Sequence, residues 1–232
     1  MTTKLTLLTR QRLHLLLLCL LLVALWPFLD EATLAGAWLG LTTAHWLTIA
    51  ILVPILHQIY VWYLWRQQLL FGNITKWLGA DGFLAYTIGF TILFVGRLLV
   101  IIGLAVANRN TLAIPPLLAY VVALLCLLPA LYLFYSVRTY FGFKRAYGID
   151  HFDPSYRTMP FVRRGIFRFT SNAMYVFGFL ILWVPGLLLL SKAALLAAAF
   201  NHLYIWVHYY CTELPDISYI YGGAATEQDF SR

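Results

Sequence analysis

The sequence predicts an all-α integral membrane protein with about six transmembrane helices. Of its 232 residues, 62% are hydrophobic and only 11% are charged, whereas soluble domains carry about 25% charged residues. The apolar residues form runs long enough to cross a hydrocarbon core of about 30 Å, which takes about 20 residues of helix. We therefore expect a multi-pass protein of a membrane such as the bacterial inner membrane or the endoplasmic reticulum.

Six apolar segments are the expected spans, because a segment in lipid must satisfy its own backbone hydrogen bonds as a helix. They cover residues 13–29, 37–65, 83–107, 112–135, 173–190 and 193–210. A signal peptide is the alternative for the first segment, but the run is long and no small-x-small cleavage site follows it, which favours a retained helix. The second segment contains Pro54 and exceeds a simple span, which predicts a kink, a tilt or an extension beyond the bilayer.

Basic residues gather in the connections on one side of these spans. Thirteen of the 16 lie there: Lys4, Arg10, Arg12, Arg66, Lys76, Arg138, Lys144, Arg145, Arg157, Arg163, Arg164, Arg168 and Arg232. By the positive-inside rule, both termini and the connection 138–168 are expected in the cytosol. The net charge of +7 therefore indicates topology, and we expect no nucleic-acid partner.

Arg97 lies well inside the third apolar segment. An arginine at the centre of a span costs at least about 2.5–3.5 kcal/mol and usually faces the bundle interior or water. Either it contacts a lipid phosphate, or it is held by helix carbonyls or extends outward to the membrane surface. The sequence leaves both interpretations open.

The last apolar segment carries a polar stripe. Five side chains follow one another at intervals of four, three, four and three residues, which places them on one helical face: His202, Trp206, Tyr209, Glu213 and Asp216. A face with carboxylates and an imidazole does not turn toward lipid. It is either a functional surface or a polar seam packed against other helices, and the mixture of residues favours a functional surface.

Two motifs near the C-terminus resemble those of a known enzyme family. Residues 164–178 contain Asn172-Ala173-Met174-Tyr175 and end at Gly178, a helix hairpin around Pro185-Gly186 follows, and Glu213-Leu214-Pro215 closes the last segment. These elements resemble the C-terminal core of phospholipid N-methyltransferases and of the related isoprenylcysteine carboxyl methyltransferases. Ala173 stands where the family motif has proline, and Thr212 replaces the first of two glutamates.

The resemblance covers about the last 90 residues. The apolar segments before it predict that residues 1–137 form four N-terminal transmembrane helices. Residues 138–232 then form the methyltransferase core, whose C-terminal helix hairpin makes a cytosol-facing cofactor site. The implied cofactor is S-adenosylmethionine, and the implied partners are a lipid substrate and the bilayer.

Carried over position by position, the resemblance assigns these residues to the cofactor site: Asn172, Met174, Tyr175, Gly178 and Glu213. Arg168 is a further cofactor-binding candidate because of its charge. We expect Glu213 to pair with the α-ammonium of the cofactor's methionine, and Arg168 or Arg164 with its carboxylate. Each arginine is alternatively a lipid-headgroup anchor. Methylation of a protonated amine also needs a proton acceptor, for which the catalytic candidates are His208, His202 and Asp216.

The resemblance thus implies a methyltransferase that acts on a membrane lipid, with N-methylation of phosphatidylethanolamine or its methylated derivatives as the first expectation. Alternative acceptors are a prenylcysteine carboxylate and a small thiol. An NADPH-dependent sterol-type reductase is a rival with a similar core, although such enzymes tend to have Gly-Glu where this chain has Gly178-Phe179. A scaffold or an ion-coupled transporter is disfavoured, because the spans hold no acidic residues and no internal repeats. The cysteines Cys19, Cys126 and Cys211 lack metal-ligand spacing, so we expect no metal site.

The charge distribution makes a testable prediction about topology. Single cysteines introduced at positions 31, 110 and 192 should react with a membrane-impermeant thiol reagent applied to intact cells, because the positive-inside rule places those connections outside. Labelling of a cysteine at position 150 from the outside would contradict this topology.

Overall fold

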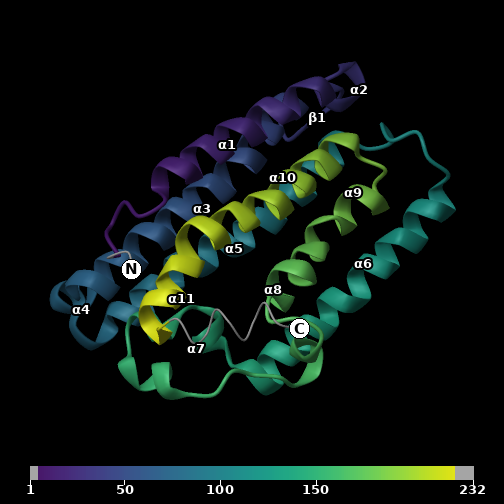
Figure 1. Cartoon of the computed structure of the whole chain (residues 1–232). Coiled ribbons are helices and arrows are strands. Elements are labelled where there is room, and N and C mark those ends of the chain that lie inside the picture. Colours follow the sequence, from purple (N-terminus) through teal and green to yellow (C-terminus); the bar gives the residue numbers. More distant parts are fainter. Residues whose placement is uncertain (1–4, 223–232) are drawn as a thin grey trace.

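The apolar runs form helices that lie side by side along a common direction (Figure 1). The computed structural model describes residues 5–222. Lys4, Arg232 and the last ten positions of the expected methyltransferase core lie outside the described residues. Within the described chain the structure is all-α apart from one two-stranded hairpin, which confirms the predicted fold class.

Within residues 5–222, four stretches are long and apolar enough to cross a membrane: Gln11–Phe28, Thr43–Phe71, Asn73–Ala107 and Pro116–Phe141. They contain the helices α1 (Gln11–Leu25), η1 (Trp26–Phe28), α3 (Thr43–Phe71), α4 (Asn73–Leu78), η2 (Gly79–Asp81), α5 (Gly82–Ala107), α6 (Pro116–Ser136) and the π-helix η3 (Val137–Phe141). The first four expected spans are therefore present as helices.

The fifth expected span is helical but broken. It consists of α8 (Ala173–Val176), the 3-10 helix η7 (Gly178–Leu182) and α9 (Val184–Leu188). Pro185, which lacks a backbone N–H, and the glycines Gly178 and Gly186 explain why one regular helix does not form here. Ser191 then caps the next helix by accepting a hydrogen bond from the Ala194 amide, so the hairpin expected around Pro185-Gly186 is present.

The sixth expected span is α10 (Lys192–His208). It continues without a gap into the π-helix η8 (Tyr209–Glu213) and α11 (Leu214–Tyr221). α10 packs against α1, α3 and α5. Its contact face is made of small, fully buried side chains, Ala193, Ala194, Ala197 and Ala198. Small residues let helix backbones approach closely, which is how helices associate in lipid.

The connections hold the short elements. α2 (Glu31–Leu34), β1 (Ala37–Trp38) and β2 (Leu41–Thr42) precede α3. The polar connection contains α7 (Phe143–Ala146), η4 (Ile149–His151), η5 (Pro154–Thr158) and η6 (Gly165–Arg168).

The second span therefore begins at Thr43, and the expectation that it begins at Ala37 was wrong. Ala37 pairs with Thr42 and Trp38 with Leu41 across a two-residue turn. Leu39 and Gly40 in that turn both have positive φ, which two-residue hairpin turns require.

Pro54 is accommodated inside α3 by a neighbouring helix. Because proline has no N–H, the carbonyl of Ala50 loses its helical donor. The side-chain amide of Asn201 in α10 donates to that carbonyl oxygen at 3.4 Å. The broken backbone bond thus becomes a link between α3 and α10.

Two buried polar side chains join the helices at the two ends of the bundle. At one end Asn108 donates to the carbonyls of Ala32 and Ala35, and its side-chain oxygen accepts from the Ala193 amide, which connects α5 to α2 and α10. The other end of the bundle carries the basic connections and is called the basic end. There the side chain of Arg66 joins the helices. We expected Arg66 in the connection between the second and third spans, but it lies inside α3.

Arg66 is fully buried and forms an ion pair with Asp216 of α11, with 3.0 Å between Nε and Oδ1. Its guanidinium also donates to the carbonyl oxygens of Leu7 at 2.9 Å, Thr9 at 2.8 Å and Cys211 at 3.2 Å. One side chain therefore connects the N-terminal segment, α3, η8 and α11.

His151 extends this cluster into the polar connection. Its ring lies 3.1 Å from Asp150 and 3.5 Å from Asp216 (nitrogen to oxygen), and it stacks on Trp65 with 4.1 Å between centroids. Burial lowers the pKa of His151, but hydrogen bonds and charges from the two carboxylates outweigh burial and raise this pKa to about 9. Tyr221 donates to Asp150 at 2.8 Å, so α11 contacts the connection at Asp150 as well as at His151.

The ion pair makes a prediction about stability. Arg66→Met should lower the free energy of unfolding by about 3–5 kcal/mol, because Asp216 is then left as a buried charge without its partner. The measurement is denaturant unfolding in detergent, followed by circular dichroism. Arg12→Met, at an exposed arginine of α1, is the matched control and should change stability by less than about 0.5 kcal/mol. Equal stability of Arg66→Met and the unmodified protein would refute the role assigned to the pair.

Candidate active site

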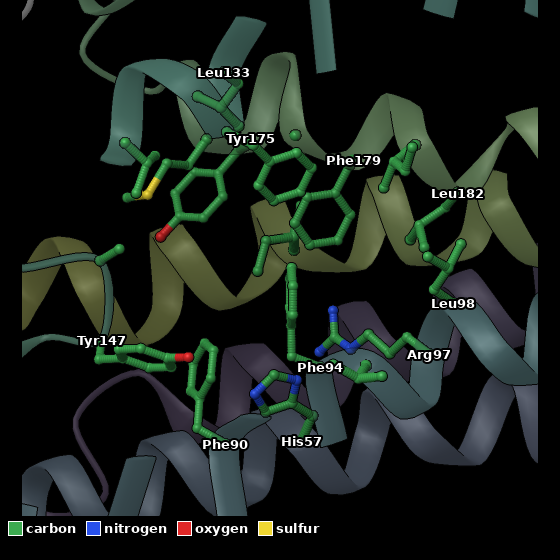
Figure 2. A pocket seen from close by; sticks show the side chains of 18 of the residues that line it. His57, Phe90, Phe94, Arg97, Leu98, Leu133, Tyr147, Tyr175, Phe179 and Leu182 are labelled. Atoms are coloured by element: carbon green, nitrogen blue, oxygen red, sulfur yellow. The ribbon is translucent and has the colours of Figure 1, made fainter. Parts of the chain in front are cut away.

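A cavity of about 470 Å³ lies among α3, α5, α6, α8–η7 and α10. This volume is within the range of small-molecule sites, which are mostly apolar with a few placed polar groups. Most of its lining is aliphatic or aromatic, and Figure 2 shows the side chains that converge on it. Its polar lining consists of His57, Gln58, Arg97, Tyr147, Tyr175 and His208.

Three of the predicted cofactor residues line this cavity: Met174, Tyr175 and Gly178. They come from the broken helix α8–η7. A Cβ atom at Gly178 would lie 2.6 Å from a methyl carbon of Leu133, so the glycine allows η7 to pack closely on α6. Among the predicted catalytic residues, His208 lines the cavity from α10.

The two predicted motifs meet through one hydrogen bond. The Tyr175 hydroxyl donates to the Glu213 carboxylate, which joins α8 to the end of η8 across 38 residues of sequence. The rings of Trp206 and Tyr209 lie 5.9 Å and 5.7 Å from the Tyr175 ring. The structure thus brings Tyr175 and Glu213 into contact, and their assignment to a cofactor site stays a prediction.

Glu213 is a carboxylate without a cationic partner. Within residues 5–222, no arginine, lysine or histidine lies within ion-pair distance of it. Burial raises the pKa of Glu213 to about 7, although the hydrogen bond from Tyr175 opposes the shift. Near neutral pH this group therefore exchanges between its acid and its anion, and a positively charged ligand would stabilise the anion.

Besides Glu213, four predicted residues lie outside the cavity lining. Asn172 is half-buried just before α8, and Arg168 is exposed, with its guanidinium 4.7 Å from the ring of Phe169. His202 accepts a hydrogen bond from the Trp183 indole at 3.1 Å. The fourth, Asp216, is the partner of Arg66.

The polar stripe does not remain on one face, because η8 is a π-helix. The wider turn of a π-helix shifts the rotation of every residue after it relative to a regular α-helix. Glu213 consequently meets Tyr175, whereas Asp216 meets Arg66. The stripe divides into a part beside the cavity and a part in the structural ion pair.

His57 is a cavity residue that the sequence analysis did not single out. It is buried within α3 and lines the cavity near Arg97 of α5. The available signal was a histidine inside an apolar run, the same kind of signal that marked Arg97. Tyr147 also lines the cavity, and its hydroxyl is hydrogen-bonded to that of Thr91 at 2.8 Å.

Comparison with known families agrees with the geometry of the two motifs. Residues 118–224 match the model of the phospholipid methyltransferase family. The chain is similar to this family over that stretch, which is a little under half of its length. The match begins within α6, so it takes in the fourth span as well as the predicted core. No curated protein and no solved structure gives a significant match to the chain.

The family match supports a membrane methyltransferase of the lipid or prenylcysteine type. It favours a methyltransferase over the sterol-type reductase. The Tyr175–Glu213 contact lies within the matched residues, beside the cavity, where the two motifs of the sequence meet.

The raised pKa of Glu213 makes a prediction about pH. A carboxyl group whose pKa rises on folding contributes stability that is present below its unfolded pKa, about 4.5, and is lost as pH rises through about 7. Titration of Glu213 should therefore lower the free energy of unfolding by at most about 3 kcal/mol between pH 4.5 and pH 7.5. Glu213→Gln should flatten the fall, and an unchanged slope in that variant would show that another group causes it.

Proposed function

We propose that this protein is an S-adenosylmethionine-dependent methyltransferase whose acceptor is the amine of a membrane phospholipid, phosphatidylethanolamine or one of its methylated derivatives. The Tyr175–Glu213 contact at the edge of the cavity is the observation that carries the proposal. It unites the two family motifs beside an apolar space. The similarity of residues 118–224 to the phospholipid methyltransferase family supports the same activity.

The residues present fit the proposed cofactor, which when bound supplies an electrophilic methyl group on a sulfonium. Glu213 offers a carboxylate that has no cationic partner within the described residues, which suits an α-ammonium group. Met174 and Tyr175 offer apolar and aromatic surface. Asn172 stands at the start of α8, and the exposed Arg168 and Arg164 are available for a carboxylate.

His208 is the proton acceptor that we propose. It lines the cavity, is 2% exposed, and its Nδ1 has no hydrogen-bond partner among the described residues. A neutral amine is needed for attack on the methyl group, so a base must be within reach of the ammonium proton. We rank His202 second as a proton acceptor, because its Nδ1 already accepts a hydrogen bond from the Trp183 indole. Asp216 ranks third, because it forms an ion pair with Arg66.

The proposed site suits a lipid acceptor because of where it lies. The motifs meet toward the basic end of the bundle, which we propose to face the cytosol together with both termini. A headgroup amine would reach the site there while the acyl chains remain among the helices. Holding the amine and the methyl group in line supplies much of the rate of such a transfer.

Cofactor binding is the first test. Titration calorimetry of the purified protein in detergent should show binding of S-adenosylmethionine. Glu213→Ala should weaken it by about tenfold or more, because a charge-assisted hydrogen bond contributes about 1.5–3 kcal/mol. Glu31→Gln, at an exposed carboxylate of α2, is the control and should leave affinity unchanged. Unchanged affinity in a folded Glu213→Ala variant, or tight binding of NADPH, would contradict the proposal.

Product analysis is the second test. Lipids from cells that express the protein should contain mono-, di- or trimethylated phosphatidylethanolamine by mass spectrometry, and the rate in vitro should rise with pH until base and amine are deprotonated. His208→Gln should lower this rate by about 10²–10⁴-fold, the usual contribution of a positioned acid or base. If methylated headgroups are absent and a prenylcysteine or small thiol is methylated instead, the phospholipid acceptor is wrong.

A further inference from the structure

The cavity contains polar nitrogens that the proposed cofactor contacts do not use. Arg97 of α5 is 4% exposed, and its Nε has no hydrogen-bond partner among the described residues. Its Nη2 lies 3.5 Å from the carbonyl oxygen of Pro54, which is too long for a strong hydrogen bond. His57 of α3 is 3% exposed, and neither of its ring nitrogens has a partner within residues 5–222.

These groups lie on the wall opposite the family motif. Figure 2 shows the guanidinium of Arg97 and the ring of His57 on one side of the space, with Tyr175 and Phe179 on the other. The guanidinium carbon is 5.8 Å from the Phe179 ring centroid, and the His57 ring packs edge-to-face on Phe90 at 4.5 Å. Apolar and aromatic side chains therefore surround both groups.

No counter-ion for Arg97 comes from the described part of the protein. Within residues 5–222, the acidic groups in ion pairs are Asp30, Asp150 and Asp216, and none of them pairs with Arg97. A buried cation without a partner is unfavourable, and such groups inside a span mark functional sites. A guanidinium presents a planar fork of donors that matches an oxyanion.

We propose that Arg97 and His57 bind the oxyanion group, a phosphate or a carboxylate, of the amphipathic acceptor. This inference rests on the proposed function and specifies its substrate class. The acceptor is an anionic amphiphile whose negative group enters the cavity and binds between α3 and α5, while its nucleophile lies toward Tyr175 and Glu213. The exposed arginines of the connection 138–168 are then not the main anion site.

A ligand-binding role for Arg97 predicts a different effect of its replacement on stability than a structural role does. A structural ion partner destabilises the fold when it is removed, as expected for Arg66. Arg97 has no such partner in the described part of the chain, so Arg97→Met should unfold at the same or a higher temperature than the unmodified protein. The same variant should lose binding of the anionic ligand.

The experiment uses native mass spectrometry of the full chain in detergent with three short-chain probes: dihexanoyl phosphatidic acid, decanoate and dihexanoylglycerol. At least one anionic probe should bind more tightly than the neutral diglyceride. Arg97→Gln should weaken that probe about tenfold or more, to the level of the diglyceride, and leave diglyceride binding unchanged. Arg97→Lys keeps the charge without the fork and should lose part of the affinity. His57→Phe should weaken the anionic probe by a smaller factor.

Arg109→Gln is the matched control, since Arg109 is exposed at the far end of α5, and it should bind all three probes as before. A preference for phosphatidic acid assigns the site to a phospholipid, and a preference for decanoate assigns it to a carboxylate substrate. Equal binding of anionic and neutral probes by the unmodified protein, or full anion affinity in Arg97→Gln, would overturn the inference. Calorimetry with S-adenosylmethionine distinguishes failure of this inference from failure of the proposed function. Arg97→Gln should bind the cofactor as tightly as the unmodified protein, whatever happens to its anion binding.

Discussion

The buried Arg66–Asp216 ion pair is the interaction on which the basic end of the bundle depends. Arg66 also donates to backbone carbonyls of the N-terminal segment and to that of Cys211, so it connects pieces of chain that are far apart in sequence. Asp216 faces His151, and His151 brings the polar connection into the same cluster. Charges this deeply buried tolerate no loss of a partner, so the helices and the connection are held in one arrangement.

The same segment that supplies Asp216 to this cluster supplies Glu213 to the candidate site. The π-helix η8 turns the two carboxylates toward different surroundings. Asp216 is neutralised by Arg66, whereas Glu213 has only the hydroxyl of Tyr175 and a pKa raised by burial to about 7. Two carboxylates in unlike surroundings take unlike roles, one in the scaffold and the other at the site.

The two walls of the cavity likewise carry different kinds of groups. The α8–η7 wall presents the side chains of the family motif, and the α3–α5 wall presents the nitrogens of His57 and Arg97. Donors fixed in apolar surroundings act strongly on charge because little water screens them. Helix packing positions both sets of groups before any ligand binds, which is the usual basis of electrostatic preorganisation.

The sequence by itself determined the membrane class, the approximate positions of the helices and the family resemblance of the C-terminal half, because hydrophobicity and short motifs are local properties. Its motifs also singled out Tyr175 and Glu213, which the structure brings into contact. It did not predict the hairpin before α3, which depends on positive φ at Leu39 and Gly40. Nor did it separate Asp216 from Glu213, because regular helical spacing takes no account of a π-helix. Only the tertiary structure decided that Arg66 is a buried partner of Asp216 and that His57 joins Arg97 in the cavity. Such contacts join residues up to 150 positions apart, and they form only when the helices pack.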